Sequence, residues 1–142
     1  MTDPVMAEIG EAVALGHSGD TAAARERFAD LWDRVEDPFH RCALAHYAAD
    51  VQADPAAELR WDRRALTAAD AVPDRSAVAA FYPSLHLNLA DVHRRLGDVE
   101  QATHHLTRAR ATLDALPDDG YGRMIRGGVD RCGARMTNPG GN

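Results

Sequence analysis

Two apolar stripes on either side of the tripeptide Leu96-Gly97-Asp98 constrain the fold of this chain more than any other feature. Apolar residues recur in steps of three and four on both sides, which is the spacing of one face of an α-helix. They are Leu85, Leu89, Val92 and Leu96 before the turn, and Val99, Ala102, Leu106, Ala109 and Leu113 after it. Gly97 can adopt the left-handed conformation that ends a helix, and Asp98 can cap the next one. Residues 81–116 are therefore predicted to form two antiparallel helices.

A weaker copy of this pair lies near the start of the chain. Helices are predicted over residues 4–15 and 21–35, and Gly19-Asp20 between them repeats the ending Gly97-Asp98. When the two turns are aligned, Ala12, Ala24 and Phe28 fall where Ala90, Ala102 and Leu106 fall. A less regular middle pair is expected over residues 38–72, with helices at 39–53 and from Pro55 to about Ala71, because proline suits the first helical position.

After the third pair, which is expected over residues 76–116, the chain contains one more apolar-periodic segment. Ser76 is expected to cap the helix that follows it, and Pro83 is expected either to lie in the first turn of that helix or to bend it. Residues 120–136 are predicted to form a terminal helix, with Met124, Ile125, Val129 and Cys132 apolar. Gly127-Gly128 inside it is costly for a helix, so we expect close packing there, with a break in the helix as the alternative. Residues 1–3 and 137–142 are expected to be a frayed end and a disordered tail.

The segment from Ala90 to Ala109, ADVHRRLGDVEQATHHLTRA, closely resembles the tetratricopeptide repeat. That family places a small residue before a Leu-Gly-Asp turn and an alanine, large apolar, alanine series after it. Ala90, Ala102, Leu106 and Ala109 match this pattern, and Pro117 follows the pair as it often does in the family. The resemblance implies an all-α fold, a right-handed α-solenoid of three antiparallel helix pairs plus a C-terminal capping helix. About seven helices would then form one domain over residues 1–136.

The composition excludes several functional classes. All 16 basic residues are Arg, and the net charge of −6 argues against nucleic-acid binding, which requires neutralisation of phosphates. No apolar run approaches the length of a membrane span. Cys42 and Cys132 lack metal-type spacing, and the absence of a signal peptide favours free thiols and a cytoplasmic location. The richness in Arg, Ala, Gly and Asp suggests a GC-rich bacterial genome, as in the actinobacteria.

A protein- or peptide-binding scaffold is the leading interpretation, because the resemblance implies a concave face lined by the first helix of each pair. Carried over residue by residue, this partner-binding face comprises Phe39, Cys42, His46, Asp50, Ser84, Leu87, Asn88, Asp91, Arg94 and Arg95. An asparagine placed like Asn88 often holds a peptide backbone in the family, and Arg95 and Arg94 can grip a carboxylate. The first pair offers no basic residues for a two-sided carboxylate clamp.

The terminal segment carries the opposite charge from the rest of the chain. Residues 123–142 contain four Arg and one Asp, within a chain that is acidic elsewhere. The four arginines form either a solvated face or a contact for an acidic partner; they are Arg123, Arg126, Arg131 and Arg135.

Other functions remain open as alternatives. The solenoid could pair as a homodimer, because three repeats are near the minimum for a stable stack. The histidines His86, His93, His104 and His105 could approach one another, but no metal-binding motif is present and we expect no metal and no cofactor. His46 and Asp50 are four residues apart, and titratable residues at this helical spacing form surface pairs more often than catalytic pairs. We therefore expect no enzyme and no catalytic residues.

Overall fold

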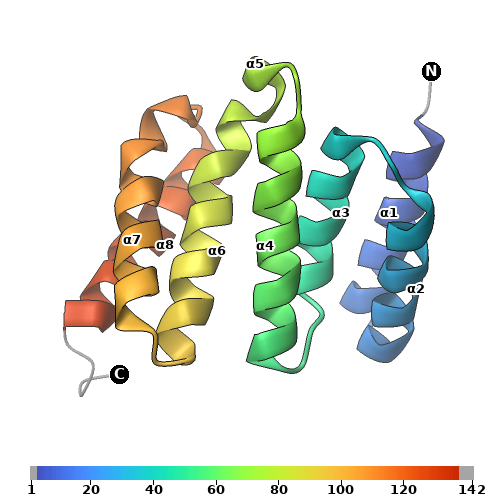
Figure 1. Ribbon diagram of the computed structural model, residues 1–142, viewed down its shortest axis with the longest axis horizontal. Coiled ribbons are helices and arrows are strands. Elements are labelled where there is room, and N and C mark those ends of the chain that lie inside the picture. Colours follow the sequence, from blue (N-terminus) through green and yellow to red (C-terminus); the bar gives the residue numbers. More distant parts are fainter. Residues whose placement is uncertain (1–2, 138–142) are drawn as a thin grey trace. The chain divides into compact units, whose positions relative to one another are not determined.

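The computed structural model describes residues 3–137, and every regular element within them is helical (Figure 1). The predicted all-α fold class is confirmed. The chain divides into two compact units, one ending at Val72 and the other beginning at Pro73. No helix within residues 3–137 combines the length and the apolar character needed to cross a membrane.

The first unit consists of two antiparallel helix pairs. Its helices are α1 (Pro4–His17), α2 (Thr21–Arg34), α3 (Pro38–Ala49) and α4 (Pro55–Ala71). An aspartate precedes each helix and accepts hydrogen bonds from its first backbone N–H groups, and proline occupies the first turn of three of them. The four capping aspartates are Asp3, Asp20, Asp37 and Asp54.

The core of the first unit is built from small residues around a few large ones. Phe28 is fully buried on α2, and Ile9 and Leu44 are nearly or fully buried on α1 and α3. Alanines cover most of the remaining buried positions, which lets neighbouring helices approach closely; they include Ala12, Ala24, Ala45, Ala48, Ala65 and Ala69. The predicted inward alignment of Ala12, Ala24 and Phe28 is confirmed.

The second unit begins with a short α5 (Arg75–Val78) and a 3₁₀ turn (Ala79–Phe81). The pair predicted around the Leu-Gly-Asp turn follows as α6 (Tyr82–Arg95) and α7 (Val99–Ala111). A second 3₁₀ turn (Leu113–Ala115) leads to α8 (Gly120–Thr137), which packs against both α6 and α7 (Figure 1). The core between these helices contains Ala90, Leu106, Ala109, Val129 and Cys132.

Both predicted Gly-Asp turns have the geometry that their residues suggest. Gly19 and Gly97 have φ angles of 100° and 82°, in the left-handed region that favours glycine. Asp20 and Asp98 then accept hydrogen bonds at 3.1 Å from the backbone N–H groups of Ala23 and Gln101. The glycine ends one helix, and the aspartate caps the next.

The structure corrects several local predictions. Helix α3 ends at Ala49 rather than at residue 53. Asp74, not Ser76, caps α5, because its carboxylate accepts hydrogen bonds from both the backbone N–H and the hydroxyl of Ser76. Val99 and Met124, which belong to the predicted apolar-periodic segments, are exposed by 69% and 58%.

The chain ends also differ from the predictions where the structure describes them. Asp3 was expected in a frayed end, but its carboxylate caps α1. Thr137 was expected in the tail, but it is the last residue of α8. Residues 1–2 and 138–142, which the predictions also covered, lie outside the described residues.

Helix α8 runs without a break through Gly127 and Gly128, so the alternative of a break in this helix is wrong. A β-carbon on Gly128 would lie 2.8 Å from Cδ2 of Leu87 on α6, so a larger residue at this position would require Leu87 to move. On the other side, a β-carbon on Gly133 would lie 2.5 Å from Nη2 of Arg110 on α7, so the Arg110 side chain would have to move. The glycines therefore allow α8 to lie close to both helices of the pair.

Candidate functional site

A cleft between α6 and α8 is the place where the structure brings predicted binding residues together. It has a volume of about 210 Å³. Leu87, Asn88 and Asp91 contribute from α6, each one turn or less from the next. Helix α8 contributes Gly128, Arg131, Cys132 and Arg135. Members of two sets that were predicted separately, the concave-face residues of α6 and the basic residues of the terminal helix, therefore line one cleft.

The side chain of Arg131 folds back along α8 over the two glycines. Its Nη1 atom would lie 3.1 Å from a β-carbon on Gly127, and its Nη2 atom 3.9 Å from one on Gly128. This leaves the guanidinium at the side of the cleft, next to the point where Leu87 meets α8. The glycines thus bring α8 close to α6 and also make room for a cation at their contact.

Asp91, the acidic residue of the cleft, is already neutralised by its own helix. Its Oδ1 atom accepts a hydrogen bond from Nη2 of Arg94 at 2.9 Å, and its Oδ2 atom accepts one from Nε of Arg95 at 3.0 Å. By contrast, Arg131 and Arg135 form no ion pair with an acidic side chain among residues 3–137. The cleft therefore carries a net positive charge in a chain whose total charge is −6.

The thiol of Cys132 lies at the base of this cleft and responds to the surrounding charges. Burial raises its pKa, and the carboxylate of Asp91 raises it further. The guanidinium groups of Arg94, Arg135 and Arg110 oppose this rise in pKa. Cys132 is only 2% exposed, so we regard it as a packing residue rather than a nucleophile.

The remaining predicted residues of the second unit lie away from the cleft surface. Ser84 is buried, and its hydroxyl donates to the carbonyl oxygen of Phe81 at 3.0 Å. Arg126 donates to the carbonyl oxygen of Leu113 at 3.2 Å and so fastens α8 to the preceding turn. Arg123 is exposed, 4.0 Å from the carboxylate of Asp118.

The predicted residues of the middle pair all lie on or at the end of α3, in the first unit. Phe39 and His46 are half-buried and Asp50 is exposed, but Cys42 is fully buried. Burial raises the pKa of the Cys42 thiol to about 11, and the charge of Asp70 adds to this shift. A single concave face that joins these residues to those of α6 stays a prediction.

His46 and Asp50 affect each other's ionisation. Burial lowers the pKa of His46, and the carboxylate of Asp50 opposes that shift. Although Asp50 as a residue is exposed, desolvation of its carboxylate by the neighbouring protein raises its pKa, and the charges of His46 and His17 oppose this rise. Asp50 and His17 line a hollow of about 300 Å³ with Tyr47 and Val13.

The histidines of the second unit stack on one another. The rings of His86 and His93 on α6 both stack on His105 of α7, with centroids 5.3 and 5.7 Å from it. The two Nδ1 atoms of His86 and His105 are 3.0 Å apart. Within residues 3–137, however, no group of three or more metal-ligating side chains is arranged to hold a metal ion.

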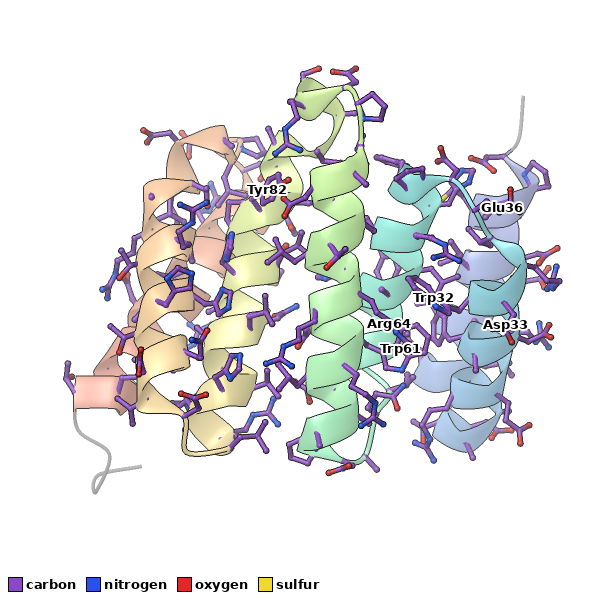
Figure 2. All side chains as sticks on the ribbon, in the orientation of Figure 1. Trp32, Asp33, Glu36, Trp61, Arg64 and Tyr82 are labelled. Carbon is purple, nitrogen blue, oxygen red and sulfur yellow. The ribbon has the colours of Figure 1, made fainter. Side chains whose placement is uncertain are left out.

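The first unit contains a cluster of two tryptophans and an arginine that was not predicted from the sequence. Trp32 on α2 and Trp61 on α4 meet edge to face, with ring centroids 5.6 Å apart. Arg64, three residues after Trp61, lies over both rings, and Figure 2 shows the three side chains side by side. The contact between Trp61 and Arg64 could have been predicted from their spacing, because residues three apart on a helix share a face.

We compared the chain with protein families, curated proteins and solved structures. No family model, no curated protein and no solved structure matches this chain.

Proposed function

We propose that this protein is a binding domain for a protein or peptide, and that the cleft between α6 and α8 receives an acidic segment of the partner. The observation that carries the proposal is the convergence of Asn88 with Arg131 and Arg135 in one cleft. Side-chain amides and guanidinium groups are the groups that hold a peptide backbone and a carboxylate.

Charge complementarity selects an acidic partner. Arg131 and Arg135 lie one turn apart on α8, and Asp91 is occupied by two other arginines. A carboxylate between the two free guanidinium groups would form charge-assisted hydrogen bonds, each contributing about 1.5–3 kcal/mol. Leu87 supplies an apolar surface beside them.

The resemblance to the tetratricopeptide repeat supports the same reading. In that family the first helices of the pairs face the ligand, and α6 is the first helix of its pair. Helix α8 follows the pair in the position of a further first helix. A binding face on α6 and α8 therefore agrees with what the resemblance implies, although it is shorter than the face predicted over two pairs.

Affinity purification with matched variants tests the proposal. The double variant Arg131→Gln/Arg135→Gln removes two charges from the cleft, and Arg27→Gln/Arg108→Gln removes two exposed charges elsewhere. We expect a partner captured from the source organism by the wild type and by the control variant to be lost with the cleft variant. A partner retained equally by all three proteins would contradict the proposal.

A further inference from the structure

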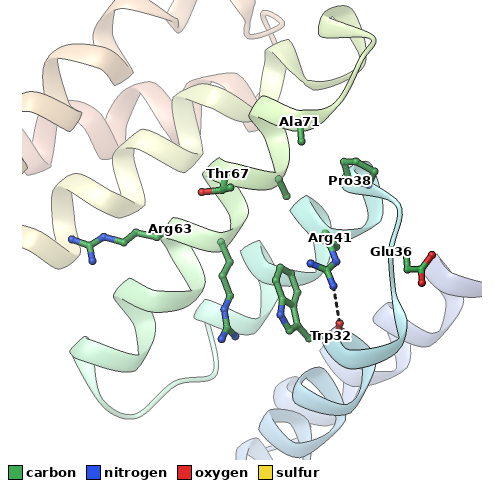
Figure 3. A pocket seen from close by; sticks show the side chains of 9 residues that line it. Trp32, Glu36, Pro38, Arg41, Arg63, Thr67 and Ala71 are labelled. Atoms are coloured by element: carbon green, nitrogen blue, oxygen red, sulfur yellow. Dashed lines mark hydrogen bonds between the residues drawn. The ribbon is translucent and has the colours of Figure 1, made fainter.

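A second pocket lies in the first unit, between α2 and α4 and over the start of α3 (Figure 3). Its volume is about 400 Å³, within the range of ligand-binding pockets. Its apolar surface comes from Trp32, Pro38, Ala68 and Ala71, and its polar rim from Glu36, Arg41, Arg63, Arg64 and Thr67. None of these residues belongs to the binding faces predicted from the sequence.

Two of the arginines are held by contacts with the indole rings. The guanidinium carbon of Arg41 lies 4.3 Å from the ring centroid of Trp32. That of Arg64 lies 5.1 Å from Trp32 and 4.6 Å from Trp61. A guanidinium stacked on an indole loses rotational freedom but keeps the N–H groups at its edge available, so it is preorganised to bind a planar anion.

Hydrogen bonds fix Arg41 further. Its Nε atom donates to the carbonyl oxygen of Val35 at 2.7 Å, and its Nη2 atom donates to that of Trp32 at 3.4 Å. Both acceptors lie at the end of α2, where backbone carbonyls have no partner within the helix. Arg41 therefore positions Trp32 and closes one end of the pocket.

The positive charge of this pocket is not neutralised by the protein itself. Within residues 3–137, none of Arg41, Arg63 and Arg64 forms an ion pair with an acidic side chain. Other arginines of the same unit do form such pairs, as Arg34 does with Glu8 and Asp30. Figure 3 shows the Glu36 carboxylate pointing away from the labelled arginines.

From this arrangement we infer that the pocket is a second docking site, and that its occupant is a peptide segment with acidic and apolar side chains. The pocket is open and Arg63 and Thr67 are exposed at its rim, which suits a segment of a protein surface better than an enclosed small molecule. Carboxylates of the segment bind Arg63 and Arg64, and an apolar side chain packs on Trp32 and Ala71. Trp and Arg are the residue types that contribute most often to interface energy.

The site differs from the cleft between α6 and α8 in unit, helices and residues. It involves the second helices of two pairs, α2 and α4, and the start of α3, and it includes an aromatic pair that the cleft lacks. The inference does not rest on the function proposed above.

Tryptophan fluorescence reports on this region, because Trp32 lines the pocket and Trp61, the other of the two Trp in the chain, contacts Trp32. The probe is an end-blocked peptide of alternating Glu and Leu, which contains no aromatic residue. We expect a saturable change in the fluorescence of the full-length protein. The same peptide with Gln in place of Glu should bind about tenfold or more weakly, because it lacks the charge-assisted hydrogen bonds.

The variant Arg63→Gln/Arg64→Gln should weaken binding of the Glu–Leu peptide at least about tenfold, whereas Arg27→Gln/Arg108→Gln should not. Arg63→Gln alone gives a test that leaves the packing on the two indoles intact, and circular dichroism verifies the fold of each variant. Three outcomes would overturn the inference: no saturable change up to millimolar peptide, equal binding of the Gln peptide, or equal binding of a single-stranded oligonucleotide.

Discussion

Substitution of Gly122 by Ala tests how closely α8 lies against the chain that precedes it. A β-carbon at this position would overlap the carbonyl oxygen of Pro117, because real β-carbon contacts essentially never fall below 3.0 Å. Because the obstructing atom belongs to the backbone, the first turn of α8 or the preceding loop must move by roughly 1 Å. Overpacking of this kind costs about 1–3 kcal/mol, whereas the higher helix propensity of Ala returns at most about 1 kcal/mol. We expect Gly122→Ala to lower the free energy of unfolding by about 1–2 kcal/mol.

Gly10→Ala is the matched control, because the chemical change is the same and the surroundings are not. Gly10 lies within α1, and a β-carbon there would meet no atom within 4 Å. This variant should gain about 0.5–1 kcal/mol from reduced chain entropy and improved helix propensity. Urea denaturation followed by far-ultraviolet circular dichroism measures both. A Gly122→Ala protein as stable as the wild type would refute the close approach of α8 to Pro117.

Three further predictions concern Gly97, the half-buried His46 and the two thiols. Gly97→Ala should lower the free energy of unfolding by about 1 kcal/mol in the same denaturation assay, because its φ of 82° is strained for any residue with a β-carbon. Because the pKa of His46 is lowered in the folded protein, the unfolded chain takes up a proton first as the pH falls below about 6.5, and the free energy of unfolding decreases. The variant His46→Gln should therefore lose less stability than the wild type between pH 7 and about pH 5. An equal loss in both proteins would contradict this prediction. Asp50, with its raised pKa, has the opposite sign and reduces the effect in wild type. Cys42 and Cys132 should both resist Ellman's reagent in the native protein and react after denaturation, because both are buried and both have a raised pKa.

The fold was predictable where local sequence and packing agree. Gly97 and Asp98 determine a turn by their own conformational preferences, and the three- and four-residue steps around them indicate which faces are buried. The apolar pattern nevertheless included one residue too many. Val99 fits the three- and four-residue spacing, but it lies in the first turn of α7 and is 69% exposed. Periodicity identifies a face of a helix, but not how far along the helix the neighbouring helix reaches.

The candidate sites were less predictable, because they depend on which helices meet. Arg131 and Arg135 belonged to a predicted set of four arginines, and Asn88 to a predicted binding face, but no pattern in the sequence indicates that these residues meet where α8 packs on α6. Only the packing of Gly128 against Leu87 brings these residues into one cleft.

The pocket of the first unit could not be predicted from the sequence for the same reason, because it also depends on which helices meet. The contact of Trp32 with Trp61 and Arg64 joins residues about thirty positions apart, and no local pattern encodes such a pairing. The three-residue spacing indicates that Arg64 and Trp61 share a face of α4, but it does not indicate a second indole beside them.

Site-specific photo-crosslinking from the cleft tests the central claim most directly. A photoreactive amino acid in place of Arg135 lies in the cleft, and one in place of Thr103 lies at an exposed position on α7 that does not line it. The account predicts that position 135 crosslinks to an acidic segment of a different protein and that position 103 does not. Crosslinks that are equal at both positions, or that join two copies of this chain, would contradict it.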